Sequence, residues 1–216
     1  MRKQLLTGVI TSMFLLGGVV GASANLITNG SFENGSYTGP DSFQTLGVGS
    51  TVITGWTVTS GSIDWIKNYW EPSEGNKSLD LAGSGASGLI VGLEFATVVG
   101  QNYLVQFDMA GNPDRSYDKA LVGATVGGLT YDFSFSQSGN TKTDMGWETM
   151  SFSFVASDDF TQLSFGNSSN NATESWGAAL DNVVVEAAPV PEPATMLLFG
   201  AGLAGLAGAR LRKKKK

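Results

Sequence analysis

The chain has 216 residues and a formal net charge of −6 at pH 7, and it contains neither cysteine nor histidine. These absences exclude disulfides and Ser-His-Asp or Cys-His catalysis, and they disfavour a zinc site. Residues 25–188 hold five basic residues against 18 acidic ones, a charge near −13, which argues against nucleic acid or anionic lipid as a partner.

The first 24 residues have the three parts of a secretory signal peptide. Arg2-Lys3 is the basic n-region, residues 5–20 are the apolar h-region, and Ala22 and Ala24 frame a small-x-small cleavage site. We therefore predict a signal-peptide helix, export by the Sec route, and a mature chain that starts directly after Ala24.

Residues 25–188 are predicted to form one all-β domain. Apolar and polar residues alternate over short runs, and Gly127-Gly128 between two of these runs is a hairpin signal. Strands at intervals of about ten residues are typical of a sandwich or a barrel. The predicted strands are 51–59, 77–81, 102–109, 120–126, 129–135, 147–155, 161–165 and 179–185.

Several segments of this domain carry a family resemblance. Residues 25–33, Asn-Leu-Ile-Thr-Asn-Gly-Ser-Phe-Glu, look like the opening strand of galactose-binding-like jelly rolls. The domain is also similar to the choice-of-anchor C family and to plant cell-wall domains with the same sandwich. The resemblance implies a jelly-roll β-sandwich of the kind found in carbohydrate-binding modules. The segments similar to choice-of-anchor C are 53–56, 61–65, 69–70, 75–81, 110–113 and 179–183.

Residues 189–216 are predicted to be a sorting signal. Pro191-Glu192-Pro193 cannot lie inside a helix, and it precedes a 16-residue apolar run and a basic tail. This order resembles the PEP-CTERM signal, which implies cleavage by an exosortase and a transient transmembrane helix in the inner membrane. The tail would stay in the cytoplasm by the positive-inside rule. The alternative is a permanent single-span anchor without processing.

Glu33 and Asp181 are the candidate metal ligands. The first and last strands of a jelly roll lie close together, so these two carboxylates could share a structural Ca²⁺ whose shell is completed by backbone carbonyls. The alternative is that Glu33 caps a turn and that Asp181 accepts hydrogen bonds from amides near Asn182.

The segment at residues 64–71 combines aromatic rings with polar side chains, as a sugar-binding surface does. Rings stack on the C–H faces of sugars, while carboxylates and amides bind the hydroxyls. We expect this segment to be a loop, although Trp56 and Trp65 could instead belong to the core. For Tyr69 and Trp70 the alternative is that the rings are buried rather than exposed for binding. The candidate ligand-binding residues in it are Asp64, Trp65, Tyr69 and Trp70.

A polar loop after the strand at 102–109 adds Asn112 and Arg115 to the candidate ligand-binding residues. Arg115 could bind a uronate or fork onto two hydroxyls. The alternative is a local salt bridge to Asp114 or Asp118, which contributes little at a surface.

Together these patterns predict an exported, exosortase-processed protein of the cell surface or extracellular matrix, whose sandwich binds exopolysaccharide without catalysis. No nucleophile–base pair is recognisable, so we name no catalytic residue. Apart from the possible Ca²⁺ we expect no cofactor. The alternatives are a self-associating structural matrix protein and, less favoured, a glycoside hydrolase.

Overall fold

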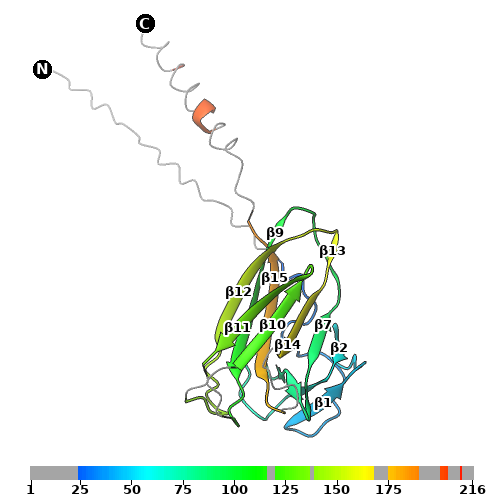
Figure 1. Ribbon diagram of the computed structural model, residues 1–216. Helices are drawn as coiled ribbons and strands as arrows, with labels where there is room; N and C mark the ends of the chain where they lie inside the picture. The colour runs from blue at the N-terminus through cyan, green and yellow to red at the C-terminus, as the bar shows by residue number, and fades with distance from the viewer. Residues whose placement is uncertain are drawn as a thin grey trace, which may run out of the picture.

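The computed structural model describes residues 24–115, 120–136, 139–167, 175–189, 200–203 and 210, and two antiparallel sheets make up most of it (Figure 1). The six-stranded sheet has the order β1 (Phe43–Gly47), β3 (Ser62–Ile66), β4 (Ser78–Asp80), β15 (Ala178–Ala187), β9 (Asn102–Gly111) and β12 (Glu148–Val155). The five-stranded sheet has the order β11 (Leu129–Phe135), β10 (Ala120–Val126), β14 (Leu163–Asn167), β7 (Leu89–Gly92) and β2 (Trp56–Ser60). The remaining strands form two short pairs, β8 (Phe95–Ala96) with β13 (Phe160–Thr161) and β5 (Ala82–Gly83) with β6 (Ala86–Ser87).

The two larger sheets pack face to face, so the predicted all-β sandwich is confirmed. From β7 onward the chain moves between the sheets: β9, β12 and β15 lie in one, and β10, β11 and β14 lie in the other. This repeated crossing is how a jelly roll wraps its strands.

Strand alternation explains which side chains form the main core between the sheets. In β12, Phe152 and Phe154 are buried, while Ser151 and Ser153 are exposed, as the sequence predicts. Trp56 is also buried in this core, where its ring lies 5.1 Å from that of Phe32. The core therefore consists of the inward sets of both sheets.

A second, smaller core lies on the outer face of the six-stranded sheet. Its buried members are Ile66, Trp70, Ala110, Met145 and Ala179, and Phe43, Tyr69 and Trp147 pack against it. Residues after β3 and before β12 thus cover part of this sheet from outside.

The two ends of the domain meet. The amide of Leu26 donates to the carbonyl of Val185 at 2.8 Å, and the amide of Val185 donates to Asn25 Oδ1 at 3.0 Å. Since β15 ends at Ala187, the chain enters and leaves the sandwich at the same end. A strand of this length spans roughly 30 Å, so residues before Ala178 lie at the opposite end.

Several predictions about the termini concern residues outside the described ranges. These are Ala22 of the cleavage site and Pro191, Glu192 and Pro193 of the sorting motif. Ala24 is described and exposed. Of the helical segments that the structure describes, none combines the length and apolar character needed to span a membrane.

Candidate functional site

Two aspartates lie opposite each other on neighbouring strands. Asp64 of β3 pairs with Asp80 of β4, and the adjacent residues Trp65 and Leu79 belong to the main core. Because side chains alternate along a strand, both carboxylates lie on the outer face of the six-stranded sheet. Directly opposed residues have Cβ atoms about 4.5–5.5 Å apart, so the two carboxylates are close neighbours.

Asp80 is buried and held by three donors. Its Oδ1 accepts hydrogen bonds from the amides of Ala82 and Gly177, both at 2.8 Å, and its Oδ2 accepts one from Asn112 Nδ2 at 2.8 Å. Burial raises the pKa of Asp80 to about 8, and the charge of Asp64 adds to this rise against the opposing effect of the hydrogen bonds.

Gly177 allows this close approach. A Cβ at this position would lie 2.6 Å from Asp80 Oδ1 and 2.4 Å from the amide nitrogen of Ala82. Only glycine fits between the strand and the carboxylate, so Gly177 fixes where the segment before β15 passes the site.

Asp64 is 6% exposed and accepts a hydrogen bond on Oδ1 from Thr45 Oγ1 at 2.5 Å. Burial raises the pKa of Asp64, and the Thr45 hydrogen bond opposes that rise. The two aspartates therefore favour a state in which they are not both ionised.

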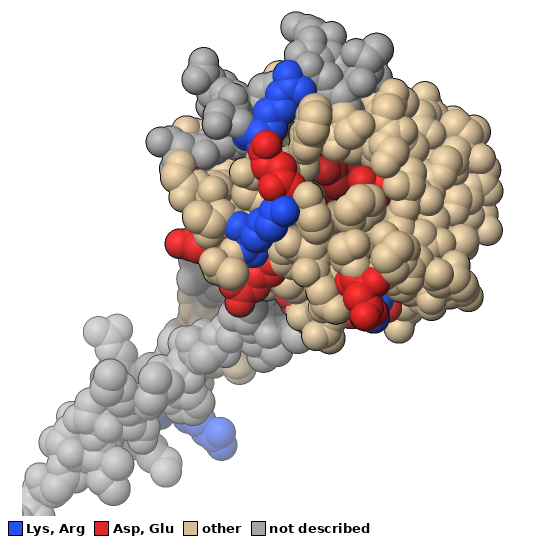
Figure 2. Space-filling view, turned by 90° about the horizontal axis from the view of Figure 1, so that it is seen from below, with Lys and Arg blue, Asp and Glu red and all other residues tan. Residues whose placement is uncertain are grey.

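These groups belong to one surface pocket of about 140 Å³. Figure 2 shows the end of the sandwich seen from below, where acidic side chains lie recessed between uncharged ones and next to basic ones. The pocket combines aromatic rings with carboxylates and an amide. Its lining is Phe43, Asp64, Ile66, Tyr69, Trp70, Asp80, Ser84, Asn112, Asp114, Ser175 and Trp176.

Trp176 is the most exposed ring of this pocket, at 41%. The guanidinium carbon of Arg115 lies 5.1 Å from the centre of the Trp176 ring, a cation–π contact. An exposed indole held by a neighbouring side chain is suited to stacking against a ligand.

Tyr69 forms another part of the rim. Its hydroxyl donates to Asp114 Oδ2, and Lys142 Nζ lies 3.0 Å from Asp114 Oδ1 and 3.7 Å from the centre of the Tyr69 ring. These contacts fix the orientation of the Tyr69 ring before any ligand arrives.

The structure brings together five of the six predicted ligand-binding residues. Asp64, Tyr69, Trp70 and Asn112 line the pocket, and Arg115 contacts its rim residue Trp176. Trp65 lies elsewhere, with no exposed surface, and its indole donates to the carbonyl of Phe32 at 2.9 Å in the main core.

Two expectations for this segment need correction. Residues 62–66 form β3 rather than part of a loop, and the alternation that exposes Asp64 to the pocket turns Trp65 inward. Trp70 is only 3% exposed, because it covers the outer face of the sheet and its indole donates to Ser78 Oγ at 2.8 Å. Trp65 therefore presents no ring to a ligand, and Trp70 forms a packed wall.

Asp80 and Trp176 are pocket residues that were not predicted from the sequence. A signal for Asp80 was available, since Leu79 and Leu81 on one face of a strand leave Asp80 on the other. For Trp176 the sequence shows only an aromatic residue in a polar segment, and its neighbours Asn112 and Arg115 are more than 60 residues away in the chain.

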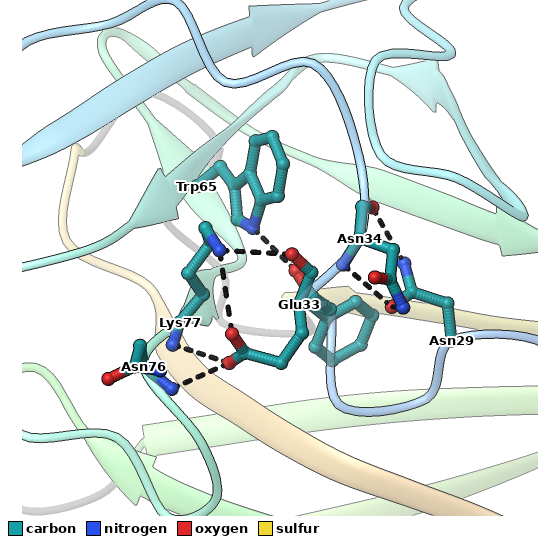
Figure 3. A network of polar contacts seen from close by, with 7 residues as sticks. Asn29, Glu33, Asn34, Trp65, Asn76 and Lys77 are labelled. Atoms are coloured by element: carbon teal, nitrogen blue, oxygen red, sulfur yellow. Dashed lines mark hydrogen bonds and ion pairs between the residues drawn. The ribbon is translucent and has the colours of Figure 1, made fainter.

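Glu33 and Asp181 both hold the loop at residues 72–77. Figure 3 shows the contacts of Glu33 with this loop. Glu33 Oε1 accepts hydrogen bonds from the amides of Asn76 and Lys77 at 2.7 Å. Lys77 Nζ donates to the carbonyl of Glu33 at 2.9 Å and lies 3.4 Å from its Oε2.

Asp181 contacts the other half of the same loop. Its Oδ2 accepts hydrogen bonds from the amides of Ser73 at 2.9 Å and Glu74 at 3.0 Å, and its Oδ1 accepts one from Asn182 at 2.7 Å. Burial raises the pKa of Asp181 to about 7, against the lowering effect of these hydrogen bonds.

Both carboxylates thus accept hydrogen bonds from backbone amides, which is the alternative to a shared metal ion that the sequence left open. A Ca²⁺ bound by Glu33 would compete with the ammonium of Lys77, so the donor set does not fit a shared Ca²⁺ without rearrangement. Within the described ranges, acidic side chains form no group of three or more that could hold a metal ion. The Ca²⁺ site stays a prediction.

The sandwich domain matches a protein family. The family model described as "Protein of unknown function (DUF642)" matches residues 25–186, which is most of the sequence. The chain belongs to the DUF642 family. Choice-of-anchor C membership stays a prediction.

A second match covers the C-terminus of this DUF642 protein. Residues 189–213 match the PEP-CTERM protein-sorting motif. The motif indicates export, sorting toward the cell surface and processing by an exosortase.

The protein is also similar to proteins of known name. It is 31% identical over 185 residues to halomucin of Haloquadratum walsbyi, covering 82% of this chain and only 2% of halomucin. Among solved structures it is similar to TmCBM61 in complex with β-1,4-galactotriose, with a TM-score of 0.46 and 13% identity over 77% of this chain and 100% of that one. It is similar to CBM35 of Paenibacillus barcinonensis with a TM-score of 0.44 and 15% identity over 67% and 99% of the chains.

Proposed function

We propose that this DUF642 protein is an exported surface protein whose sandwich binds polysaccharide without chemically altering it. The observation that carries the proposal is the pocket in which Asp64, Asp80 and Asn112 lie beside the exposed ring of Trp176. A sugar offers an apolar C–H face to an indole and hydroxyls to carboxylates and amides, so the pocket has both kinds of partner.

The acids of the pocket favour an uncharged glycan. Even when Asp80 is protonated, Asp64 and the rim residue Asp114 would repel a uronate, and residues 25–188 hold 18 acidic residues against five basic ones. Arg115 lies against the Trp176 ring, where it could hydrogen-bond the hydroxyls of a stacked sugar. The ligand class that fits is therefore a neutral polysaccharide.

The position of the pocket suits a surface protein. Ser175 and Trp176 precede β15, and the sorting motif follows β15 at its far end. The pocket therefore lies at the end of the sandwich that is remote from the anchoring segment, where a polymer outside the membrane can reach it.

Affinity electrophoresis tests the proposal. Residues 24–189 contain both sheets and both hydrophobic cores, so they can be produced alone and run through gels that contain galactan, xylan or β-glucan, with polygalacturonate as the anionic comparison. We expect a neutral polymer to retard the protein and Trp176→Ala to reduce that retardation. If the native protein migrates as fast in the gels that contain polymer as in a gel without polymer, the proposal is wrong for these polymers.

A hydrolase would give a different result with the same protein. Two neighbouring carboxylates with perturbed pKa values are also what a glycosidase uses. Release of reducing ends that Asp64→Asn or Asp80→Asn abolishes would replace the binding proposal with a catalytic one.

A further inference from the structure

The five-stranded sheet carries a second pocket, of about 330 Å³, on its outer face. In the register of this sheet Thr125 pairs with Ser164 and Ser164 pairs with Val91. The neighbouring residues Val126, Leu163 and Ile90 are all in the main core. The three paired residues therefore point outward and form the floor of the pocket.

The wall of this pocket is a fixed segment between β12 and β14. Thr97 Oγ1 donates to the carbonyl of Asp158 at 2.7 Å, and the amide of Thr97 donates to the carbonyl of Asp159 at 2.8 Å. Gln162 Nε2 donates to the carbonyl of Gly92 at 3.0 Å. These contacts tie the wall to Thr97, which follows β8, and to Gly92 at the end of β7. The pocket is therefore formed before a ligand binds.

Phe160 gives the pocket an exposed ring. It is 64% exposed although it lies in β13, where it pairs with Ala96. The other lining groups include the hydroxyls of Ser157 and Ser164 and the amide of Gln162, and no lysine or arginine is among the described residues that line the pocket. A ring beside hydroxyl and amide groups, with Asp158 as the one charged residue of the described lining, matches a neutral, hydroxyl-rich ligand.

We propose that this pocket is a second carbohydrate-binding site, with Phe160 as its stacking platform. It stands apart from the Asp64–Asp80 pocket in two ways. The two pockets are on the outer faces of different sheets, hence on opposite sides of the sandwich. The Phe160 pocket is also at the end where β12 finishes, whereas the Asp64–Asp80 pocket is at the end where β15 begins.

Two sites on opposite sides of one rigid domain have a consequence that one site lacks. A single polymer segment cannot contact both, so each domain can hold two polymer chains and crosslink them. This crosslinking rests on the proposed function of the Asp64–Asp80 pocket, whereas the Phe160 site does not depend on it.

Four versions of residues 24–189 test the proposal: the native sequence, Phe160→Ala, Trp176→Ala and the double variant. Each is run in gels with galactan, xylan or β-glucan and is also mixed with the same polymers in solution, where light scattering reports crosslinking. Val48→Ala, at an exposed position after β1 that lines neither pocket, is the control.

We expect each single variant to be retarded less than the native protein and to lose the rise in light scattering, and the double variant to migrate freely. Thr125→Tyr, which fills the floor of the second pocket, should reproduce Phe160→Ala. If Phe160→Ala and Thr125→Tyr bind and crosslink like the native protein, the second site is wrong. If Phe160→Ala alone removes all retardation, the second site stands and the Asp64–Asp80 pocket is not a glycan site. Free migration of the native protein would overturn both the Phe160 site and the Asp64–Asp80 site.

Discussion

Asp64 and Asp80 are paired directly across β3 and β4, and both turn away from the main core into the same pocket. Two carboxylates this close favour a state in which they share a proton. Burial raises the pKa of both, and the charge of Asp64 adds to the shift of Asp80.

This pairing predicts how stability depends on pH. The pKa of Asp80 is about 8 in the folded protein and 3.8 in the reference state, so the folded protein binds this proton more tightly than the unfolded chain does. The resulting stabilisation is complete below about pH 4 and is lost as the pH rises toward 8. Asp181, whose folded pKa is about 7, acts in the same direction.

We therefore expect the free energy of unfolding, measured by urea titration, to fall between pH 4 and pH 8. Asp80→Asn should make that dependence shallower, because one titrating group is removed. Asp132→Asn, at an exposed position of β11, makes the same charge change and should leave the slope as it is. An unchanged slope in Asp80→Asn would show that Asp80 does not carry the effect.

Trp176→Ala should separate binding from stability. The side chain is 41% exposed, so its removal leaves little cavity, and we expect the midpoint of thermal unfolding to shift by no more than about 2 °C. Retardation in gels that contain a neutral polysaccharide should decrease. A folded Trp176→Ala variant that is retarded like the native protein would exclude this ring from the site.

Trp70→Ala should behave in the opposite way. The ring is buried against the outer face of the six-stranded sheet and its indole hydrogen-bonds Ser78. Its removal should cost about 3–5 kcal/mol of unfolding free energy, measured by urea titration against Trp176→Ala. Native stability in Trp70→Ala would mean that this ring is not packed as described.

Glu33→Ala should loosen the loop at residues 72–77. The amides of Asn76 and Lys77 lose their acceptor, which should cost about 1–3 kcal/mol and speed hydrogen exchange in that loop. Glu94→Ala removes an exposed carboxylate of the linker between β7 and β8 and is the matched control. Exchange in the loop that matches the native rate would count against its dependence on Glu33.

The ion pair between Glu33 and Lys77 allows a test of the Ca²⁺ prediction. With the Lys77 ammonium against Glu33, we expect Ca²⁺ and chelator to give the same midpoint of thermal unfolding. Lys77→Met removes the competing cation, so any Ca²⁺-dependent rise should be larger in that variant. A rise of several degrees in the native protein would mean that Ca²⁺ displaces Lys77 and that Glu33 is a metal ligand.

Local features were enough to predict much of this protein. Alternation identified the inward set of β12 and the buried Trp56, because a strand's two faces follow from its sequence alone. The sorting motif was also evident, because its three parts are contiguous in the chain. The polar residues Asp64, Asn112 and Arg115, which the sequence singled out, lie in or beside one pocket, and their role in binding stays a prediction.

Only the tertiary structure decided which rings face solvent. The sequence left open whether Trp65 and Trp70 are exposed. In the structure, alternation along β3 turns Trp65 into the main core, and packing over the six-stranded sheet buries Trp70. Asp80 and Trp176 join the site through the pairing of β4 with β15. Those contacts join residues about 100 positions apart, and their formation depends on strand pairing across the whole domain rather than on any local pattern.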